Sequence, residues 1–341
     1  MYTSPSSSGK RILITGATGF IGGHLVRAAL KAGYKVWIAV RAETDPRKAQ
    51  ALGVNTVPMD YTDEEAMLCQ IEQHSPKGDP AWHYIIHNAG ITKSRDLKEF
   101  NEVNAEHTRR LCSALKRSRG GVERFILMSS LSTYGEAMGD RPISVEDKQK
   151  PHSAYGASKL LAEQYVRASG LPYTILLPTG VYGPGDKDYL MAIQSIAKGL
   201  NFMSGLTKQT LTFVYGEDLA RAALLTLTHD QAKGKSYIVS DGATYTDEEF
   251  SRLAQRLLGT KYCLHLRAPL WFLWIICQFG SLWTRLTGRT TPINRDKYPI
   301  LSQRSWRCDA SPLFELGFVP SYPLEEGLRR TIEAARTEGL L

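Results

Sequence analysis

Residues 15–22 read Thr-Gly-Ala-Thr-Gly-Phe-Ile-Gly, and this stretch decides the fold. Its glycines suit three different tasks. Gly16 permits a tight turn, Gly19 lets the backbone approach a pyrophosphate, and Gly22 lets a helix pack on a strand. A helix that starts here offers unpaired N–H groups and the positive end of its dipole to phosphates. The stretch therefore predicts a turn that binds a dinucleotide, with further contacts from Thr18, Phe20 and Ile21.

The flanking sequence makes this glycine pattern specific. The apolar run Arg11–Thr15 before it predicts a buried strand, and Phe20–Ala32 after it predicts a helix that Gly33 closes. Strands and helices then alternate, which predicts a parallel sheet covered by helices on both faces. The further expected strands are Lys35–Val40, His83–His87, Arg124–Ser129 and Tyr173–Leu177. The expected helices are one opened by Thr62 and Glu65 as a capping box, Phe100–Arg117 and Ser158–Ser169.

After Pro178 the alternation loosens. The expected elements there are strands at Leu211–Val214 and Lys235–Val239, a helix capped by Asp218, and the helix Phe250–Leu258 after a Thr246–Glu249 capping box. The predicted fold class is α/β: a doubly wound parallel-sheet Rossmann domain with a smaller mixed C-terminal substrate lobe. We expect a tail over 1–9, the Rossmann domain over 10–180 with returns near 208–240, and the lobe over 181–207 and 241–341.

Composition limits the class of protein. The chain has 341 residues, of which 43% are hydrophobic and 22% charged, and these fractions exclude disordered, collagen-like and coiled-coil chains. Five cysteines without a CxxC spacing argue against a disulfide framework and a zinc site. The first ten residues contain no apolar segment typical of a secretory signal. We therefore expect a cytoplasmic location.

The net charge of +8 is concentrated in two zones. Residues 10–48 hold eight Lys or Arg against Glu43 and Asp45, and residues 261–307 hold eight against Asp296 alone. A nucleic-acid binder more often shows one basic stripe with interleaved aromatics, so no nucleic-acid partner is expected. Two zones fit two anionic ligands, or a ligand and a surface; simple solvated charge is the alternative for the second zone.

The run Ala268–Thr284 is rich in Trp and contains no charged residue over 17 positions. A membrane span needs about 20 residues, so we do not expect one here. Three interpretations stay open: a helix packed on the second lobe, a wall of an apolar substrate pocket, or a membrane-surface helix. In the third, peripheral contact through 268–285 would be anchored by Trp and by Arg267, Arg285 and Arg289.

Tyr155-Gly156-Ala157-Ser158-Lys159 places a tyrosine and a lysine four residues apart, on one face of a helix. A tyrosine, with a pKa of about 10, is a poor base at neutral pH, and a neighbouring ammonium favours its phenolate. Ser130 follows an expected strand and can donate a hydrogen bond to the same substrate oxygen. Together with the glycine turn, this set predicts proton exchange at a hydroxyl or carbonyl group.

The second strand ends Val40-Arg41, where an NAD-preferring site usually carries Asp or Glu. Arg41 would instead meet a 2′-phosphate, with Arg47 or Lys48 as a second cation. The expected cofactor is therefore NADP. NAD stays possible because Glu43 lies two positions further on.

The chain resembles an extended short-chain dehydrogenase/reductase, of the NAD-dependent epimerase/dehydratase family, from Lys10 to about the C-terminus. The matching segments are TGATGFIG, Asp60, His87–Gly90, Asn104, Ser129-Ser130, YGASK, Leu177–Pro184 and Phe213–Asp218. The resemblance implies catalytic roles for Ser130, Tyr155 and Lys159, with Asn104 keeping the proton relay open. The cofactor contacts that go with it are Asp60, Tyr61, Asn88, Ala89, Gly90, Pro178, Thr179, Gly180 and Val181. The expected substrate contacts are Thr92, Ser132, Ser153 and Tyr182.

Residues 294–327 are most similar to the branch that contains dihydroflavonol-4-reductase and 3β-hydroxysteroid dehydrogenase. Sugar-nucleotide 4,6-dehydratases of the family carry an Asp-Glu pair directly after the catalytic Ser or Thr. Leu131 and Ser132 stand there in this chain, so dehydration is not expected. The histidines His24, His83, His87, His107 and His152 show no ligand spacing, and no metal site is predicted.

The expected function is hydride transfer between a nicotinamide and a secondary alcohol or ketone of a hydrophobic, steroid- or flavonoid-like substrate. One alternative is a nucleotide-sugar 4-epimerase with tightly bound NAD. A second is a non-enzymatic dinucleotide sensor or assembly factor, against which the intact Ser-Tyr-Lys set argues. A homodimer is the expected assembly.

Overall fold

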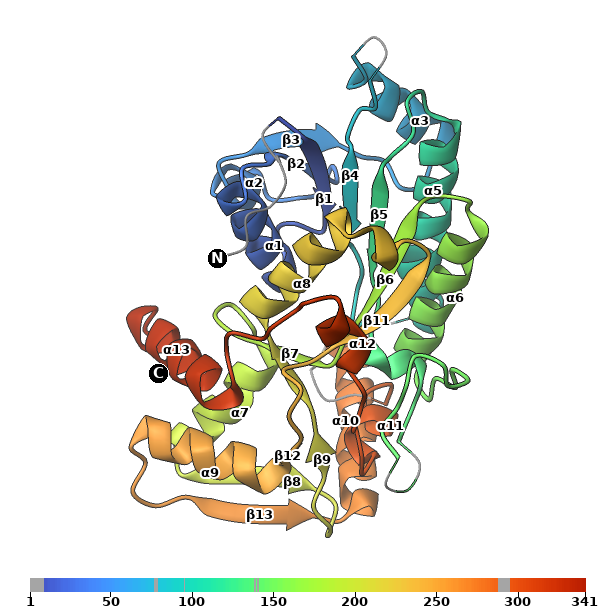
Figure 1. Ribbon diagram of the computed structural model, residues 1–341. Coiled ribbons are helices and arrows are strands. Elements are labelled where there is room, and N and C mark those ends of the chain that lie inside the picture. The colour runs from blue at the N-terminus through green and yellow to red at the C-terminus, as the bar shows by residue number, and fades with distance from the viewer. Residues whose placement is uncertain (1–8, 77–78, 95, 138, 140, 288–294) are drawn as a thin grey trace.

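The computed structural model describes residues 9–76, 79–94, 96–137, 139, 141–287 and 295–341. The expected tail, except for Gly9, lies outside these residues, as do Arg289 and Asn294. A seven-stranded parallel sheet forms the centre of the molecule, in the order β11-β6-β5-β4-β1-β2-β3 (Figure 1). Its strands are β1 (Arg11–Thr15), β2 (Lys35–Val40), β3 (Asn55–Pro58), β4 (Tyr84–His87), β5 (Arg124–Met128), β6 (Tyr173–Pro178) and β11 (Lys235–Val239).

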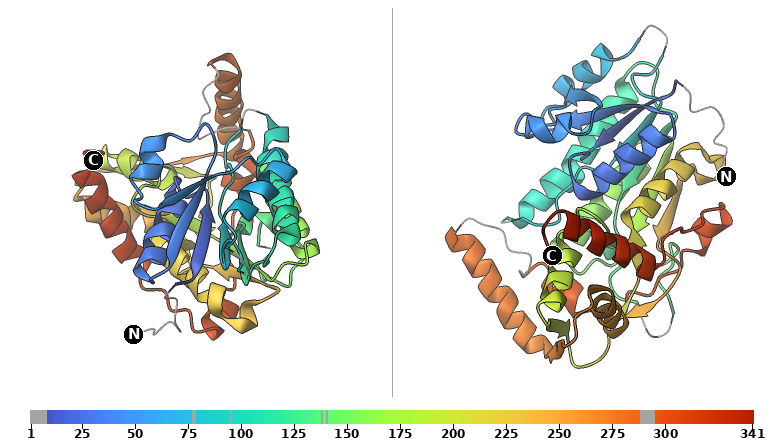
Figure 2. Two further views of the ribbon diagram at one scale, coloured as in Figure 1. Left: turned by 90° about the horizontal axis from the view of Figure 1, so that it is seen from above. Right: turned by 90° about the vertical axis from the view of Figure 1, so that its left-hand side faces the viewer.

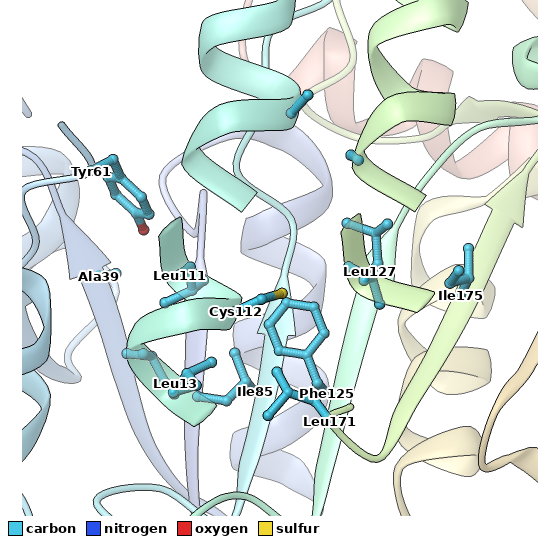
Figure 3. Close-up of a cluster of buried hydrophobic side chains, with 14 of the residues drawn as sticks. Leu13, Ala39, Tyr61, Ile85, Leu111, Cys112, Phe125, Leu127, Leu171 and Ile175 are labelled. Atoms are coloured by element: carbon cyan, nitrogen blue, oxygen red, sulfur yellow. The ribbon is translucent and has the colours of Figure 1, made fainter. Parts of the chain in front are cut away.

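Helices cover both faces of this sheet, as the sequence predicts (Figure 2). One face packs against α3 (Glu64–Gln73), α5 (His107–Arg117) and α6 (Ala154–Ala168). The other packs against α1 (Phe20–Lys31), α8 (Gly216–Thr228) and the short α12 (Ser311–Glu315). Figure 3 shows the first layer, where Leu111 and Cys112 of α5 lie on Ile85 and Phe125 of neighbouring strands. The long apolar runs of the strands follow from burial on both faces.

A smaller lobe lies beyond the carboxyl ends of the strands (Figure 1). Its strands pair as β7 (Gly180–Tyr182) with β10 (Phe213–Tyr215), β8 (Leu200–Ser204) with β13 (Leu264–Ala268), and β9 (Thr210–Leu211) with β12 (Tyr245–Thr246). Its helices are α7 (Asp188–Ala197), α9 (Asp247–Leu258), α10 (Leu270–Thr287), α11 (Tyr298–Ser302) and α13 (Leu324–Thr337). A third apolar cluster, around Tyr182, Phe213 and Phe250, is the core of this lobe.

Three predicted helix starts are corrected. The helix expected at Thr62 begins at Glu64, because the Asp63 side chain accepts from Glu65 N and Ala66 N and caps it. The helix expected at Ser158 begins at Ala154, because the Ser153 hydroxyl accepts from Gly156 N. Asp218 lies inside the first turn of α8 and does not cap it. The Thr246–Glu249 capping box is confirmed.

The helix expected at Phe100–Arg117 is divided. It consists of α4 (Leu97–Phe100), a π-helical segment Asn101–Glu106, and α5. Such a segment adds a residue to the turn, and it often marks a functional site. The helix α2 (Pro46–Gln50) was not predicted, and two 3₁₀ turns lie at Leu131–Thr133 and Asp230–Ala232. Within the described part of the chain, no helix is long and apolar enough to cross a membrane.

Candidate active site

A cavity of about 1040 Å³ lies between the sheet and the lobe. One end is lined by the glycine turn after β1 and by residues that follow β2. The middle is lined by Ser130, Tyr155 and Lys159, and the far end by residues of the lobe. Most predicted contacts line this cavity: Gly16, Thr18, Gly19, Phe20, Ile21, Arg41, Lys48, Tyr61, Asn88, Ala89, Gly90, Thr92, Asn104, Ser132, Pro178, Thr179, Gly180 and Val181.

Two glycines of the turn have no room for a side chain. Gly16 has φ +65°, and a Cβ there would lie 2.8 Å from Ala89 Cα. A Cβ at Gly22 would lie 2.2 Å from Gly16 O and 2.5 Å from Ala17 Cα. Gly22 therefore packs the helix on the turn that follows β1, rather than on the strand itself, and it does not line the cavity. The open backbone of the turn and the N-terminus of α1 fit the phosphates of a dinucleotide.

Buried hydrogen bonds hold the turn against β4. Thr15 Oγ1 accepts from Ala89 N at 3.0 Å and lies 2.8 Å from His87 Nδ1. The Thr108 hydroxyl donates to Asn104 O at 2.7 Å, so at 2.9 Å it can only accept from His87 Nε2–H. Burial lowers the pKa of His87 to about 3. His87 is thus a neutral core residue with both nitrogens bonded, in agreement with its interpretation as structural.

The end of β2 presents cations to the cavity. Arg41, Thr44 and Lys48 line it, whereas Glu43 does not. The Arg41 guanidinium is half-exposed and lies 3.0 Å from the Glu43 carboxylate. The sequence did not single out Thr44, which accepts from Arg41 N at 3.0 Å and so holds the start of this loop.

Asn104 fastens the loop after β4. Its amide accepts from Ile91 N at 2.8 Å and donates to Ile91 O at 3.0 Å and to Ser158 Oγ at 2.9 Å. It lies in the π-helical segment, and a Cβ at Gly90 would come within 2.8 Å of its oxygen. The predicted relay role stays a prediction; the contacts show that Asn104 positions the loop over α6.

Ser130, Tyr155 and Lys159 meet in the middle of the cavity. Ser130 Oγ accepts from Ser132 N at 3.2 Å and from Ser132 Oγ at 2.9 Å, which leaves its own proton free to donate. Burial raises the pKa of Tyr155, and the hydrogen bond with Ser130 opposes that rise. Tyr155 lies in the first turn of α6, and its ring centroid is 6.2 Å from that of Phe100.

Lys159 is buried, and burial lowers its pKa to about 8. The Glu163 carboxylate one turn further along α6 partly opposes this fall. Glu163 is itself fully buried; it accepts from Ser129 and Gln149 and pairs with Arg167 at 3.0 Å. Glu163 was not predicted from the sequence, although its i+4 spacing from Lys159 was a usable signal.

Two lysines meet one carboxylate at the lobe end. Asp188 accepts from Lys93 Nζ at 2.6 Å and from Lys297 Nζ at 3.0 Å. The three residues come from the loop after β4, from α7 and from the segment before α11, and all of them line the cavity. The remaining lining there includes apolar side chains at Ile91, Val103, Leu211, Ile300, Leu301 and Trp306.

Besides Gly22, three predicted contacts lie outside the cavity lining. Asp60 is outside the cavity lining, and its carboxylate accepts from Thr62 N and Thr62 Oγ1 at 2.9 and 2.7 Å. Tyr182 is fully buried in the lobe core, where its ring packs against Phe213 and Tyr215. Ser153 caps α6 and is buried below the lining. These residues are close in sequence to residues that line the cavity, but their side chains pack elsewhere.

No group of three or more His, Cys, Asp or Glu among the described residues could hold a metal ion. His24 packs its ring against Phe20, and His83 Nδ1 accepts from Arg11 N at 3.1 Å. Both therefore have structural contacts.

The comparisons with known proteins identify the family of the chain. Residues 12–240 match the family described as "NAD dependent epimerase/dehydratase family". The chain belongs to that family. A ceramide reductase of Caulobacter vibrioides is 30% identical over 335 residues, which cover 97% of this chain and 96% of that protein. A UDP-glucose 4-epimerase of Vibrio cholerae is 28% identical, and 98% of each chain is covered.

Solved structures share the fold. A UDP-glucose 4-epimerase from Thermotoga maritima, solved with UDP-glucose, superposes with a TM-score of 0.75 at 22% identity, over 96% of this chain and 99% of that one. The family and its reductase and dehydrogenase members make this chain an NAD(P)-dependent enzyme of the extended short-chain dehydrogenase/reductase type. The predicted family, fold class and enzyme type are confirmed.

Proposed function

We propose that this enzyme interconverts a ketone and a secondary alcohol on a long apolar molecule, with NADP as its cofactor. The observation that carries the proposal is the apolar wall that Leu211, Ile300, Leu301 and Trp306 form at the lobe end of the cavity. Each Å² of apolar surface that is buried on binding contributes about 25 cal/mol to the binding free energy. Such a wall therefore favours a substrate with an alkyl chain or an apolar ring system.

The chain's own residues divide the chemistry at the substrate oxygen. Ser130 donates a hydrogen bond to that oxygen, and the Tyr155 hydroxyl gives it a proton in reduction or takes one in oxidation. The Lys159 ammonium stabilises the phenolate that Tyr155 becomes when it has lost its proton. A bound nicotinamide supplies or accepts the hydride at the carbon. The glycine turn, Asn88 and Pro178–Val181 would hold the cofactor.

Two relatives support an alkyl-chain substrate. One is the ceramide reductase, and the other is a 2-alkyl-3-oxoalkanoate reductase of Stenotrophomonas maltophilia, which is 28% identical over 94% of this chain and 98% of that protein. Both names describe reduction on a molecule with alkyl chains. NADP is supported by Arg41, Thr44 and Lys48, which line the cavity while Glu43 does not.

The test compares ligands and turnover on the purified chain. Thermal unfolding would be followed in the presence of NADPH, with one candidate ligand added at a time. The candidates are 3-oxo long-chain amides, hydroxysteroids, flavonoids, UDP-glucose and dTDP-glucose. A ligand that binds the native state raises the melting temperature, and NADPH oxidation reports turnover. We expect shifts and turnover from an apolar ketone. Shifts from the nucleotide sugars alone would overturn the proposal.

A 4-epimerase is the second candidate, because the cations Lys93, Lys187 and Lys297 line the lobe end of the cavity. They could meet the diphosphate of a nucleotide sugar. An epimerase would retain NAD through purification and convert UDP-glucose without net consumption of the cofactor. Two variants separate these functions. Replacing Trp306 with Ala should lower the turnover of an apolar ketone. Replacing Lys93 with Ala, which removes its ammonium, should weaken the binding of a nucleotide sugar and leave the binding of an apolar ketone unchanged.

A further inference from the structure

Helix α10 is exposed along most of its surface. It stands away from the rest of the molecule in both views of Figure 2. Among the side chains of α10 that the structure describes, Leu273, Cys277 and Thr284 are buried and form a narrow stripe. Trp271 is 66% and Phe279 67% exposed, and the other exposed apolar side chains of α10 are Phe272, Trp274, Ile276, Leu282 and Trp283. Soluble monomers rarely expose so many large apolar side chains together, and such patches mark interaction surfaces.

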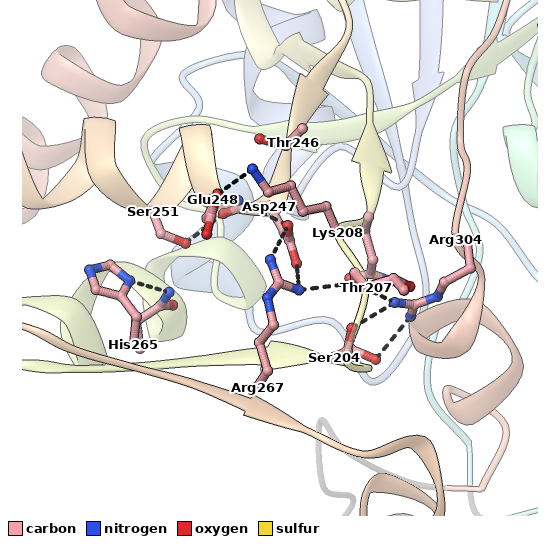
Figure 4. Close-up of polar contacts among 12 residues, drawn as sticks. Ser204, Thr207, Lys208, Thr246, Asp247, Glu248, Ser251, His265, Arg267 and Arg304 are labelled. Carbon is pink, nitrogen blue, oxygen red and sulfur yellow. Dashed lines mark hydrogen bonds and ion pairs between the residues drawn. The ribbon is translucent and has the colours of Figure 1, made fainter. Parts of the chain in front are cut away.

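The strands that lead into α10 extend this surface. β13 pairs with β8 in a register that places Leu264 beside Leu200 and Leu266 beside Phe202, and these four side chains are exposed. Of the alternate residues, Asn201, His265 and Arg267 make polar contacts on the inner side of these strands (Figure 4). Asn201 contacts His265 at 3.0 Å, and Arg267 pairs with Asp247 at 2.9 Å. The outer face of β8–β13 is thus apolar, although its inner face is well bonded.

The excess of positive charge around this surface indicates an anionic partner. Residues 250–295 contain no Asp or Glu but seven Lys or Arg. Among the described side chains, Arg252 pairs with Glu248, Arg256 with Glu325, and Arg267 with Asp247, and these three acidic residues lie outside the stretch. In the sequence, Lys261, Arg285, Arg289 and Arg295 stand before and after the apolar run. Lys261 and Arg295 are exposed.

We propose that α10 and the outer face of β8–β13, together the α10 surface, bind an anionic phospholipid bilayer. Trp side chains favour the boundary between headgroups and acyl chains, and cations beside them attract anionic lipids. Because α10 is not apolar enough to span a bilayer, it would lie in the plane of the membrane surface. A second copy fits less well, because it would bring two basic surfaces together.

The α10 surface is continuous with the wall of the cavity. Helix α11 packs against α10 and contributes Ile300 and Leu301 to the cavity lining. Docking would therefore place one cavity wall next to the bilayer. Membrane docking does not depend on the proposed function, and vesicle binding can be measured without any substrate.

The test is co-sedimentation of the full chain with vesicles of phosphatidylcholine alone or mixed with phosphatidylglycerol. We expect binding to the mixed vesicles, a fall in binding as salt is raised, and a blue shift of Trp emission on binding. In Trp271→Asp/Phe279→Asp, both changed side chains are two-thirds exposed, so the fold should survive. Binding should fall at least about tenfold, because two aromatic anchors are lost and two negative charges are added.

The matched control is Leu97→Asp/Val319→Asp, which places the same charges at exposed apolar positions in α4 and between α12 and α13, outside the α10 surface as defined above. It should bind vesicles like the native chain. Lys261→Glu/Arg295→Glu tests the charge separately and should weaken binding to the mixed vesicles. Absence of vesicle binding, or equal loss in the control, would overturn the proposal. So would a dimer in solution that the Trp271→Asp/Phe279→Asp pair converts to a monomer while vesicle binding is unchanged.

Discussion

The two ends of the cavity are built in different ways. The cofactor end uses backbone, at a turn where glycines within eight consecutive residues let the chain approach phosphates. The lobe end uses side chains from distant segments, such as Lys93, Asp188 and Lys297. Backbone geometry within one short segment restricts the ligand class strongly. A wall assembled from several segments can change its substrate by changing single side chains.

The largest expected effect lies where the two ends meet. Tyr155→Phe keeps the ring and its contact with Phe100 but removes the hydroxyl. Turnover should fall at least about a hundredfold, the lower range for a general acid–base group. Cofactor affinity, measured by fluorescence titration, should be unchanged. Near-native turnover on an identified substrate would show that the proton comes from another group.

Lys159→Met should make the cofactor-free protein more stable at neutral pH. Burial lowers the pKa of Lys159 from 10.5 to about 8, so the unfolded chain binds this proton more tightly than the folded one. The penalty is present in full below about pH 8 and disappears as the pH rises to about 10.5. At about 1.4 kcal/mol per pKa unit, the variant should gain about 3 kcal/mol at pH 7.

Urea unfolding of both proteins at pH 7 and pH 10 measures this difference. The gain should shrink at the higher pH, and catalysis should be lost. A variant less stable than the native chain at pH 7 would mean that the electrostatic attraction between Lys159 and the Glu163 carboxylate outweighs the burial of the Lys159 charge.

Arg41→Ala tests the cofactor end. Loss of one charge-assisted contact of about 1.5–3 kcal/mol should weaken NADP binding roughly ten- to a hundredfold. NAD affinity should hardly change, and Arg47→Ala is the control, because Arg47 bonds Asp45 and does not line the cavity. Titration of both dinucleotides decides the point. Equal affinity of the native enzyme for both would contradict the preference for NADP.

The smallest expected effect concerns the lobe. Thr246→Ala removes the capping box of α9 and should cost about 1 kcal/mol. If the lobe and the Rossmann domain unfold as one unit, far-ultraviolet circular dichroism and Trp fluorescence will show one coincident transition at lower urea. A separate early transition in the variant would show that the lobe unfolds independently.

Much of the Rossmann half could be predicted from sequence. The bounds of β1, β2 and β11 agree with the expected ones, because continuous apolar runs bounded by turn residues are typical of buried parallel strands. Helix starts were harder. Asp63 and Ser153 cap helices that were expected to begin at Thr62 and Ser158. Such starts are hard to predict because several side chains near a helix start can accept from its N–H groups.

The lobe end of the site could not be predicted in the same way. Nothing in the neighbourhood of Asp188 in the sequence indicates that Lys93 and Lys297 pair with it. Tyr182 was expected to contact the substrate, but packing in the lobe core buries it.

By itself, the sequence determined the glycine turn, the Tyr155–Lys159 pair and the family, because each depends on spacing within a few residues. The tertiary structure decided which side chains face the cavity and which face solvent, since those depend on segments that meet only when folded. Helix α10 shows the difference most clearly. Its composition allows a packed helix, a pocket wall or a surface helix, and only the arrangement of its neighbours leaves its aromatic side exposed.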